Sequence, residues 1–347
     1  MQARVGIDEA TWSATMERLP PGSRDIYFQP DFHRLHAANG DGVPHCSIVE
    51  DDGAFLLIPG LRVPIDGSRW DLQTCRTGCA GPLTNAGDNR EFLERAWSVW
   101  TMEMARQGAV AALFRLHPLI TTERWLPETA RVDDDRSVVF ADLREGRERA
   151  WIDAETRHRN MVRKGRQLDV TVTWHDGRDE FVALYHASME RLGAAHDLRF
   201  TAGFFAALWN LPAARLAVAR EAGALKAGAV FLFGDRWVHY YLSARTASAG
   251  NYATSVLIDA ALDSAAALNL DGVYLGGGRS TAADDDLLRF KRSVGGRLLP
   301  YRVGRVVVDE VAFEQLTRAW TAAAGAPPNW LLGYRQPVPV PQRAMDV

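Results

Sequence analysis

The chain contains 347 residues, of which 47% are hydrophobic and 24% are charged, and its formal net charge is −3. This apolar fraction is large enough to offset the conformational entropy lost on folding, which excludes an intrinsically disordered chain. No stretch approaches the roughly 20 apolar residues that cross a bilayer, so we expect no membrane span.

The N-terminus and the cysteine count indicate the compartment. The opening residues, MQARVGIDEATW, carry acidic side chains where a secretory signal would carry an apolar core. The three cysteines are too few for a disulfide framework. We therefore expect a reduced, cytoplasmic protein. At about 100–200 residues per domain, we also expect two domains.

The first part of the chain alternates short apolar runs with turn residues. Apolar residues recur at every fourth position within 92–108, as expected of one buried helix face. These residues are Phe92, Ala96, Trp100 and Met104. Strands are predicted at residues 47–50, 54–65, 109–119 and 137–143. The polar, acidic segment 128–137 favours a surface loop, and we place the domain boundary near Leu143.

The second part combines helices with a run of three strands. AG and GD turns join the strands at 214–221, 224–234 and 236–244, which predicts antiparallel hairpins. Helices are predicted at residues 147–167, about 178–192, 204–210, 252–269 and 313–323. Further strands are predicted at residues 169–175, 272–277 and 302–310. A mixed α+β layer structure is the simplest arrangement of these elements.

The charge is unevenly distributed along the chain. Residues 146–305 carry 22 Lys and Arg against 17 Asp and Glu, a balance of +5, whereas the remainder has a balance of −8. The stretches 157–166 and 287–305 contain five and six cations, respectively, and no acid. Clustered cations can concentrate an anionic partner even on a protein of negative net charge. The alternative for the first cluster is a solvated helix face.

Several common catalytic and binding motifs are absent from the sequence. Cys75 and Cys79 have a spacing close to that of zinc ligands, but Cys46 is the only other cysteine, so we expect no metal site. There is no G-x-S-x-G nucleophile elbow and no P-loop motif. The glycines at 276–278 do not fit the dinucleotide-binding G-x-G-x-x-G pattern. A serine hydrolase, a P-loop nucleotidase and a Rossmann enzyme are therefore disfavoured.

The most specific pattern lies in the last third of the chain. One predicted strand ends at Ser243, with Arg245 just beyond it, before a long helix of small residues. A second strand ends in three glycines, where the main chain can closely approach a ligand. These glycines are Gly276, Gly277 and Gly278. A short helix is predicted next, and its chemically notable side chains are Asp286, Phe290 and Lys291.

This pattern resembles the Fem-type transferases, a branch of the GNAT acyltransferase superfamily. The shared features are LGGG followed by D-x-L-x-x-F-K-x-x-x-G, an upstream H-Y-x-L-S, and a helix with A-x-x-x-L-I-D-A-A. The strings RHRNMVRKGRQLDVTV and FVALYHASMERLGAAHDLRFTAGFF are also similar to that family. The resemblance covers about residues 147–305 and is weaker over the N-terminal part.

The resemblance implies an α+β fold of two tandem GNAT-like lobes, each a mixed, largely antiparallel sheet flanked by helices. Residues 1–143, completed by 306–335, would form the acceptor-side lobe, and residues 144–305 the catalytic lobe. The Pro-rich tail at 336–347 is expected to be extended or disordered. Many Fem proteins carry a coiled-coil arm, but this sequence has no long heptad run, so we expect an armless version.

The resemblance also implies roles for individual residues. Lys291 and Phe290 match the family's F-K pair, so Lys291 would engage the donor or stabilise an oxyanion, while Phe290 would pack against a terminal base or the acyl group. The residues expected on the donor side are Gly276, Gly277, Gly278, Ser243, Arg245, Arg163 and Lys164. The residues expected on the acceptor side are Arg199, Arg34, His36 and Tyr241. His239 and Asp286 are candidate bases.

Fem-type enzymes transfer an amino acid from aminoacyl-tRNA to an amine, so the expected partners are charged tRNA and an amine-bearing acceptor. We expect no DNA partner, no tightly bound cofactor, and a monomer or weak dimer. The alternative is an acyl-CoA-dependent N-acyltransferase, although Arg245-Thr-Ala-Ser-Ala-Gly250 lacks the first glycine of the usual pyrophosphate motif. A third reading is a non-catalytic binding protein on a degenerate transferase fold.

Overall fold

The computed structural model describes residues 1–194, 198–282 and 284–339. The chain divides into two compact units. Unit 1 contains residues 1–15, 42–133 and 302–347, and unit 2 contains residues 16–41 and 134–301. The expected division had assigned residues 16–41 to the first lobe, whereas they pack with unit 2. Part of the expected tail, residues 340–347, lies outside the described residues.

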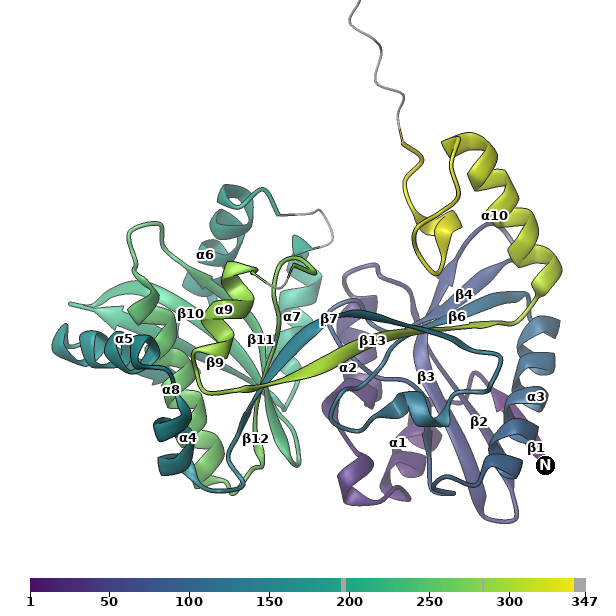
Figure 1. The fold of residues 1–347 in the computed structure, drawn as a ribbon, viewed down its shortest axis with the longest axis horizontal. Coiled ribbons are helices and arrows are strands. Elements are labelled where there is room, and N and C mark those ends of the chain that lie inside the picture. The colour runs from purple at the N-terminus through teal and green to yellow at the C-terminus, as the bar shows by residue number, and fades with distance from the viewer. Residues whose placement is uncertain (195–197, 283, 340–347) are drawn as a thin grey trace, which may run out of the picture. The chain divides into compact units, whose positions relative to one another are not determined.

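Unit 1 contains a run of six neighbouring sheet strands in the order β1-β2-β3-β4-β6-β13 (Figure 1). The strands are β1 (Gln2–Val5), β2 (Val43–Asp51), β3 (Ala54–Pro64), β4 (Trp70–Gln73), β6 (Ala109–Arg115) and the second half of β13 (Arg297–Val307). The short β5 (Leu83–Thr84) pairs with β3. Only the β4–β6 pair is parallel among the described pairs of this sheet.

The helices of unit 1 are α1 (Glu9–Glu17), which ends in unit 2, α3 (Arg90–Arg106) and α10 (Glu310–Ala324). The predicted apolar face of α3 is confirmed, because Phe92, Ala96, Trp100 and Met104 are all buried. Asn89 caps this helix by accepting a hydrogen bond from the Phe92 N–H.

Unit 2 contains another run of six neighbouring sheet strands, in the order β7-β12-β11-β10-β9-β8. Its strands are the second part of β7 (Arg131–Asp142), β8 (Thr171–Trp174), β9 (Ala214–Glu221), β10 (Ala224–Phe233), β11 (Trp237–Arg245) and β12 (Gly272–Gly277). Only β11 and β12 run parallel among the described pairs. Its helices are α2 (Pro30–Ala37), α4 (Arg147–Asp153), α5 (Thr156–Gln167), α6 (Arg178–Arg191), α7 (Ala202–Asn210), α8 (Asn251–Ala267) and α9 (Asp286–Arg292).

The two sheets share one topology. In each, three antiparallel steps lead to a strand that pairs in parallel with the next one, and a long helix (α3 or α8) joins the parallel pair. Each sheet is then completed by an antiparallel strand from elsewhere in the chain, β13 in unit 1 and β7 in unit 2. The expected mixed fold of two similar lobes is therefore confirmed.

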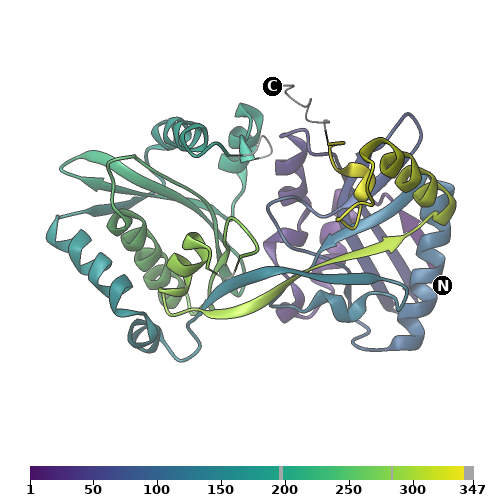
Figure 2. The same ribbon diagram turned by 45° about the horizontal axis from the view of Figure 1, so that its top comes forward.

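Helices cover both faces of the unit 2 sheet. An added Cβ at Gly228 of β10 would meet Phe181 of α6, whereas Ala227 and Ala229 belong to a core cluster with residues of α8. Because successive strand residues point to opposite faces, α6 and α8 lie on opposite sides. Figure 2 shows this arrangement, with α6 and α7 on one face and α5 and α8 on the other.

The hairpin turn between β9 and β10 was predicted correctly, and its geometry explains why. Ala222 and Gly223 both have positive φ angles, 48° and 79°. This conformation matches a two-residue turn whose twist suits antiparallel strands. Glycine accommodates such a φ without strain, so the AG pair in the sequence is a good indicator of the turn.

Two predictions differ from the structure in more than their bounds. The helix expected over 147–167 is two helices, α4 and α5, because Gly295 packs against the backbone at Ala154 and the Glu155 N–H donates to the Ser293 carbonyl. The loop expected over 128–137 is wrong from Arg131 onward, where β7 begins. Acidic side chains suit a solvent-exposed strand as well as a loop, so the composition of this segment does not distinguish the two.

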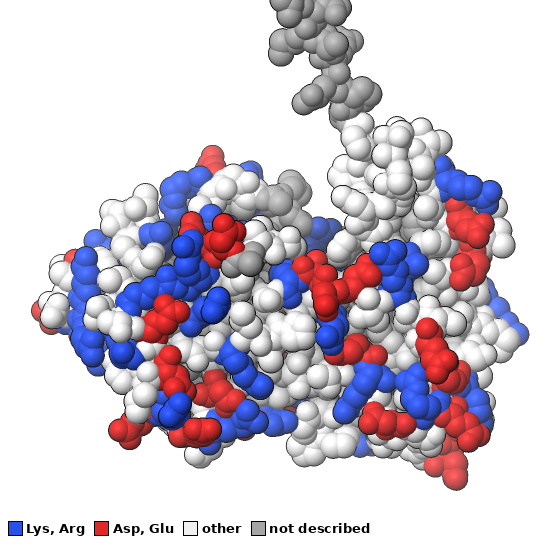
Figure 3. All heavy atoms as spheres, in the orientation of Figure 1, with Lys and Arg blue, Asp and Glu red and all other residues white. Residues whose placement is uncertain are grey.

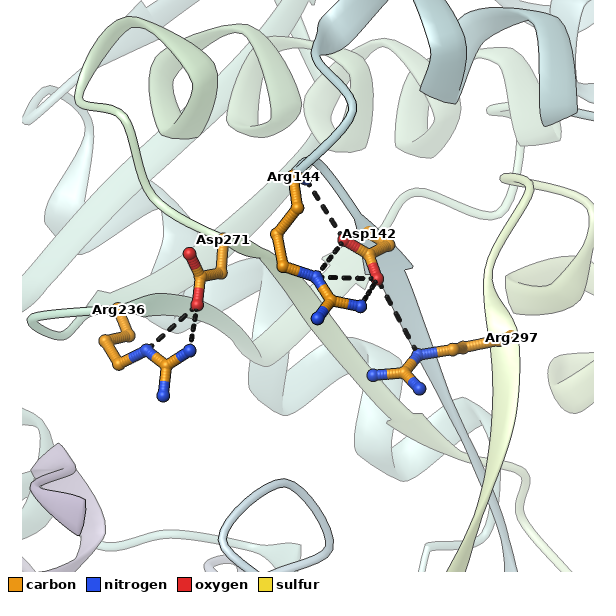
Figure 4. A network of polar contacts seen from close by, with 5 residues as sticks. All are labelled: Asp142, Arg144, Arg236, Asp271 and Arg297. Atoms are coloured by element: carbon orange, nitrogen blue, oxygen red, sulfur yellow. Dashed lines mark hydrogen bonds and ion pairs between the residues drawn. The ribbon is translucent and has the colours of Figure 1, made fainter. Parts of the chain in front are cut away.

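A network of ion pairs fixes the end of the unit 2 sheet at which β12 begins (Figure 4). Arg144 Nε lies 2.9 Å from Asp142 Oδ1, and Arg297 Nε lies 3.9 Å from the other oxygen of that carboxylate. Arg236 Nε donates to Asp271 Oδ2 at 2.9 Å. The hydrogen bond and charge of Arg144 lower the pKa of Asp142. These contacts join β7, β13 and the loops before β11 and β12, so the parallel pair is held together at this end.

Candidate functional site

The parallel strands β11 and β12 separate partway along their length. Their pairing ends at His239 and Tyr274, although β11 continues to residue 245 and β12 to residue 277. An extra residue interrupts each strand's other pairing just beyond this point, Tyr241 in β11 and Leu275 in β12. Such bulges bend strands and redirect side chains, often next to active sites. The result is an opening between two strands inside unit 2.

Lys291 spans this opening. The side chain comes from α9, is 8% exposed, and donates from Nζ to the Gly277 carbonyl of β12 at 2.8 Å. The same Nζ lies 5.7 Å from the centre of the Tyr240 ring of β11. Burial lowers the pKa of Lys291 to about 7, while the negative charge of Asp285 opposes that shift. A lysine of this pKa can donate or accept a proton near neutral pH.

Asp285 fixes the start of α9 and thereby the position of Lys291. One carboxylate oxygen accepts from the Leu288 N–H at 2.9 Å, and the other accepts from the N–H groups of Arg279 and Ser280, each at 3.0 Å. Burial raises the pKa of Asp285, but these hydrogen bonds outweigh it and lower the pKa to about 2. The carboxylate is therefore an ionised N-cap, which is favourable at a helix N-terminus.

Each glycine of the triplet occupies a position that a side chain would disturb. Gly276 has a φ of 72°, and a Cβ there would lie 3.5 Å from Lys291 Nζ. A Cβ on Gly277 would lie 3.0 Å from Arg136 Cδ, and one on Gly278 would lie 2.4 Å from Asp285 Oδ1. The triplet thus keeps the main chain open beside Lys291 and leaves room for the cap of α9.

On β11, Tyr240 forms the wall opposite the triplet. Burial raises the pKa of Tyr240 to about 12, while a hydrogen bond with Ser243 opposes that shift. Arg245, at the end of the strand, donates to the Ala249 carbonyl and so closes the loop before α8. Ser243 therefore interacts with the hydroxyl of the tyrosine whose ring lies near Lys291, whereas Arg245 organises the adjoining loop.

Exposed cations extend from this opening over α5 and α9. We call this the α5–α9 basic surface, and its residues are Arg157, Arg163, Lys164, Arg289 and Arg292. Figure 3 shows Lys and Arg side chains gathered over these two helices. The helices are in contact, because Arg157 donates to the carbonyl of Arg289. Arg157 also pairs with Glu155, and Arg289 with Asp286.

Arg163 and Lys164 lie beside uncharged groups of this surface, and Lys164 also interacts with the Glu221 carboxylate. Arg163 donates to the Asn160 side-chain carbonyl at 3.0 Å, and its guanidinium lies 6.0 Å from the centre of the Trp151 ring. Lys164 Nζ lies 5.5 Å from the centre of the Tyr252 ring. Exposed cations beside aromatic rings suit a polyanion that also carries bases.

The two candidate bases occupy contrasting environments. His239 is fully buried, and its Nε2 lies 2.8 Å from Asp25 Oδ2, with the rings of Tyr27 and Tyr274 packed around it. Asp286 is an exposed residue in the first turn of α9. The carboxylate that acts on Lys291 is instead that of the neighbouring Asp285.

The four residues expected to bind the acceptor have different partners in the structure. His36 and Tyr241 are in contact, with His36 Nε2 3.2 Å from the Tyr241 hydroxyl. Arg34 is exposed and pairs with Asp31. Arg199 is exposed and donates to the carbonyl of Ala194 at 3.3 Å. Phe290 packs partly buried against the unit 2 core cluster.

Sequence reasoning missed four residues that shape this region, namely Asp25, Asp41, Tyr240 and Asp285. The local signal for Asp285 was present, since an aspartate three residues before a buried leucine is typical of an N-cap. Asp25 lies 214 positions from its partner His239, and no local pattern could have joined them.

Comparison with known proteins agrees with this geometry. Residues 153–292 match the family model described as an acetyltransferase (GNAT) domain. The matched segment contains α5 to α9, the opening between β11 and β12, and Lys291. A search of curated proteins gave no match. No helix in the described part of the chain has the length and apolar character needed to cross a membrane.

Solved structures of low sequence identity share the fold. A structure of FemX has a TM-score of 0.68 at 12% identity, covering 91% of this chain and 99% of that one. The C-terminal domain of a putative lysylphosphatidylglycerol synthetase from Agrobacterium fabrum has a TM-score of 0.55 at 16% identity, covering 88% and 94%. A tandem GNAT protein from the clavulanic acid biosynthesis pathway has a TM-score of 0.51 at 10% identity, covering 88% and 99%.

Proposed function

We propose that this chain, an acyltransferase with a GNAT domain and a Fem-like fold, moves an aminoacyl group from aminoacyl-tRNA to an amine. The acceptor would be a small molecule, a peptide or a nucleotide-linked compound, such as a cell-wall precursor or a natural-product intermediate. The observation that carries the proposal is the buried Lys291 ammonium held between the separated strands β11 and β12.

The reaction needs little covalent machinery from the protein. The acceptor amine attacks the acyl carbonyl carbon, a C–N bond forms, and the C–O bond to the tRNA ribose breaks. Negative charge develops on the carbonyl oxygen, where the Lys291 ammonium would stabilise it. The glycines at 276–278 would let the donor approach the main chain, and Phe290 would pack beside the donor's terminal base or acyl group.

The α5–α9 basic surface supports a polyanionic donor over a small one. Arg163 and Lys164 would contact the tRNA backbone beyond the acyl group, and such contacts supply salt-dependent affinity. Ser243 and Arg245 would lie on the donor side of the opening. The acceptor would approach near Arg34, His36, Arg199 and Tyr241.

The second candidate is an acyl-CoA-dependent N-acyltransferase, which the GNAT domain match favours. CoA would then place its pyrophosphate at the loop before α8. Arg245 already donates to the Ala249 carbonyl within that loop. Because this hydrogen bond already uses part of the Arg245 guanidinium, we expect the loop to bind the CoA pyrophosphate weakly.

One experiment separates these donors. Mixed tRNA charged with radiolabelled amino acids is incubated with the protein and a panel of amines, with and without ribonuclease, beside a parallel reaction with acetyl-CoA. We expect label to reach an acceptor amine and ribonuclease to abolish that transfer. Product formation from acetyl-CoA alone would establish the second candidate, and micromolar CoA affinity by calorimetry would support it.

A further inference from the structure

We propose that Asp41, His36 and Tyr241 form a proton relay in unit 2, in which the Tyr241 hydroxyl takes the proton of the attacking amine. The inference rests on the proposed acyl transfer and adds the base that this reaction needs. Tyr241 would be the catalytic residue because it would touch the amine. His36 and Asp41 would be positioning residues that act through it.

The three side chains form a continuous hydrogen-bonded chain. Asp41 Oδ2 lies 2.6 Å from His36 Nδ1, and His36 Nε2 lies 3.2 Å from the Tyr241 hydroxyl. An ionised carboxylate only accepts hydrogen bonds, so Nδ1 of His36 carries the proton and donates to Asp41. Nε2 is then an acceptor for the Tyr241 O–H. This tautomer is the one that can receive a proton from the tyrosine.

The surroundings of the imidazole favour proton transfer within the chain. His36 is fully buried, and the rings of Phe32 and Phe204 lie 5.0 Å and 5.9 Å from its own ring. Electrostatic interactions are stronger in such an apolar setting, so Asp41 stabilises an imidazolium more effectively than it would in water. Asp41 is itself held by the Asn39 side-chain amide, which donates to its Oδ1 at 3.0 Å.

Three titratable groups within unit 2 interact with His36. Asp41 approaches from the loop after α2, and Tyr241 approaches from β11. His33 lies on the same helix, and its interaction with His36 is repulsive when both are protonated. Burial lowers the pKa of His33 to about 4, so His33 is neutral at physiological pH. Of these three groups, Asp41 is the one whose carboxylate would stabilise a protonated His36.

The fold places Tyr241 beside the opening. Tyr241 is the extra residue of the β11 bulge, two positions beyond the last pair with β12. The ring of its neighbour Tyr240 lies near Lys291 Nζ and packs against the core cluster on the α8 side of the sheet. Tyr241 instead packs against Phe32 and Phe204. An amine in the opening would thus meet a base from one side and an oxyanion-stabilising ammonium from the other. Tyr241 is only partly buried, as a residue that meets a substrate must be.

The buried pair of Asp25 and His239 is a weaker candidate for the same role. Its side chains are 1% and 0% exposed, and Tyr27 and Tyr274 enclose the imidazole. A substrate would have to displace packed rings to reach His239. In the Asp41 relay, by contrast, the buried histidine contacts a tyrosine that is itself only partly buried.

The proposed step balances without another reactant. The amine nitrogen forms a bond to the acyl carbon and gives one proton to Tyr241 Oη. Tyr241 passes its own proton to His36 Nε2, and Asp41 stabilises the resulting imidazolium. As the C–O bond of the donor breaks, the departing oxygen receives the proton back along the same chain. The relay returns to its starting state and the products are an amide and an alcohol.

The main test compares single-turnover transfer by Tyr241→Phe, His36→Gln and Asp41→Asn with the wild-type chain across pH 5–9. General-base catalysis contributes about 10²–10⁴-fold, so we expect Tyr241→Phe to lower kcat by about 10²-fold with little change in KM. The rise of the rate with pH on the acidic side should vanish in His36→Gln. Hydroxylamine, an amine that is already unprotonated at neutral pH, should reduce the defect of Tyr241→Phe.

Tyr185→Phe is the matched control, because Tyr185 belongs to the same aromatic region but donates to the Leu198 carbonyl. It should retain the wild-type pH profile. The comparison uses whichever donor the wild-type chain accepts, so a failed tRNA assignment does not affect it. In the free protein, nitrogen NMR should show the His36 proton on Nδ1. An unchanged kcat and pH profile in Tyr241→Phe, or a proton on Nε2, would overturn the relay.

Discussion

At the scale of single residues, the charge of Lys291 is unfavourable for folding stability but favourable for the proposed activity. Its ammonium is buried against Tyr240 and has one backbone acceptor, so desolvation is incompletely offset. Replacing a buried charge with an apolar side chain of similar length often stabilises a protein. The same ammonium is what the proposed transfer step requires.

Lys291→Met should therefore separate the two properties. We expect single-turnover transfer to fall by about 10²–10³-fold, as on loss of an oxyanion-stabilising group. We expect the free energy of unfolding at pH 7 to rise by roughly 1–2 kcal/mol, measured by urea denaturation. Lys226→Met is the control, since Lys226 pairs with Glu221 away from α9. A loss of both activity and stability would show that Lys291 is mainly structural.

The pKa of Lys291, about 7, also predicts a pH dependence. The protonated form stabilises an oxyanion, so the transfer rate should fall as pH rises above about 7. An unfolded lysine keeps its ordinary pKa near 10.5, so the unfolded chain binds more protons between these values and the free energy of unfolding should increase from pH 7 to 10. Lys291→Arg stays charged in this range and should lose the alkaline fall in rate. An alkaline limb that persists in that variant would assign it to another group.

At the scale of elements, the sequence was most informative where short-range chemistry determines structure. Strands β9 and β12 were predicted with their observed bounds, because turn residues and glycines define their ends. The break between α4 and α5 could not be predicted, because it depends on Gly295, which is more than 130 positions away. The bulge at Tyr241 likewise depends on the register with β10.

The candidate site follows the same division. Lys291 and the glycine triplet were found from a contiguous pattern, and the structure brings them together. The residues that determine the environment of Lys291 were not predicted, because they are distant in sequence or lie one position away from the residue that was chosen. Asp285 was missed in favour of Asp286, although only the former caps α9. Tyr240 becomes a wall of the opening only because β11 and β12 separate.

The cap of α9 can be tested by filling the space that Gly278 leaves. Gly278→Ala would place a Cβ 2.4 Å from Asp285 Oδ1, so the carboxylate must move and its hydrogen bonds to the start of α9 must weaken. We expect a loss of about 1 kcal/mol in the free energy of unfolding, as for a lost N-cap, with a reduced transfer rate. Gly67→Ala, which meets nothing within 4 Å, should be neutral. Equal behaviour of the two variants would refute the role of the cap.

The α5–α9 basic surface predicts a salt-dependent partner. The double variant Arg163→Glu and Lys164→Glu should weaken tRNA binding by at least tenfold at low salt and flatten the dependence of affinity on salt concentration. Filter binding over a range of salt concentrations measures both effects. Arg318→Glu on α10 of unit 1 is the control, since Arg318 is also exposed and pairs with Glu314 of its own helix. Unchanged binding at low salt would show that the cations of α5 face solvent and do not contact tRNA.

At the scale of the whole molecule, the two units repeat one topology but differ in their chemistry. Each contains a parallel pair with a connecting helix, but the matched GNAT segment and the clustered cations belong to unit 2. Residues 16–41 add His36 and Asp25 to unit 2 from the start of the chain. The local patterns of the sequence could not assign this segment, because its attachment depends on contacts with β11 more than 200 positions away.

Buried histidines in both units predict how the protein unfolds in acid. Burial lowers the pKa of His45 in unit 1 and of His33 and His158 in unit 2 to about 4. The unfolded histidines titrate near 6.5, so between pH 6.5 and 4 the unfolded chain binds more protons and the folded state loses stability as the pH falls. For each histidine the loss at pH 5 is about 2 kcal/mol.

His158→Phe tests this contribution at one position. The imidazole of His158 is 2% exposed, so an aromatic replacement keeps most of the packing while removing the titrating group. The variant should lose about 2 kcal/mol less than the wild-type chain between pH 7 and pH 5, measured by urea denaturation at each pH. His186→Phe, at an exposed site on α6, should follow the wild-type chain. If both variants lose stability as the wild type does, acid unfolding begins elsewhere, and the ionised carboxylates of Asp142 and Asp285 are then the next groups to replace.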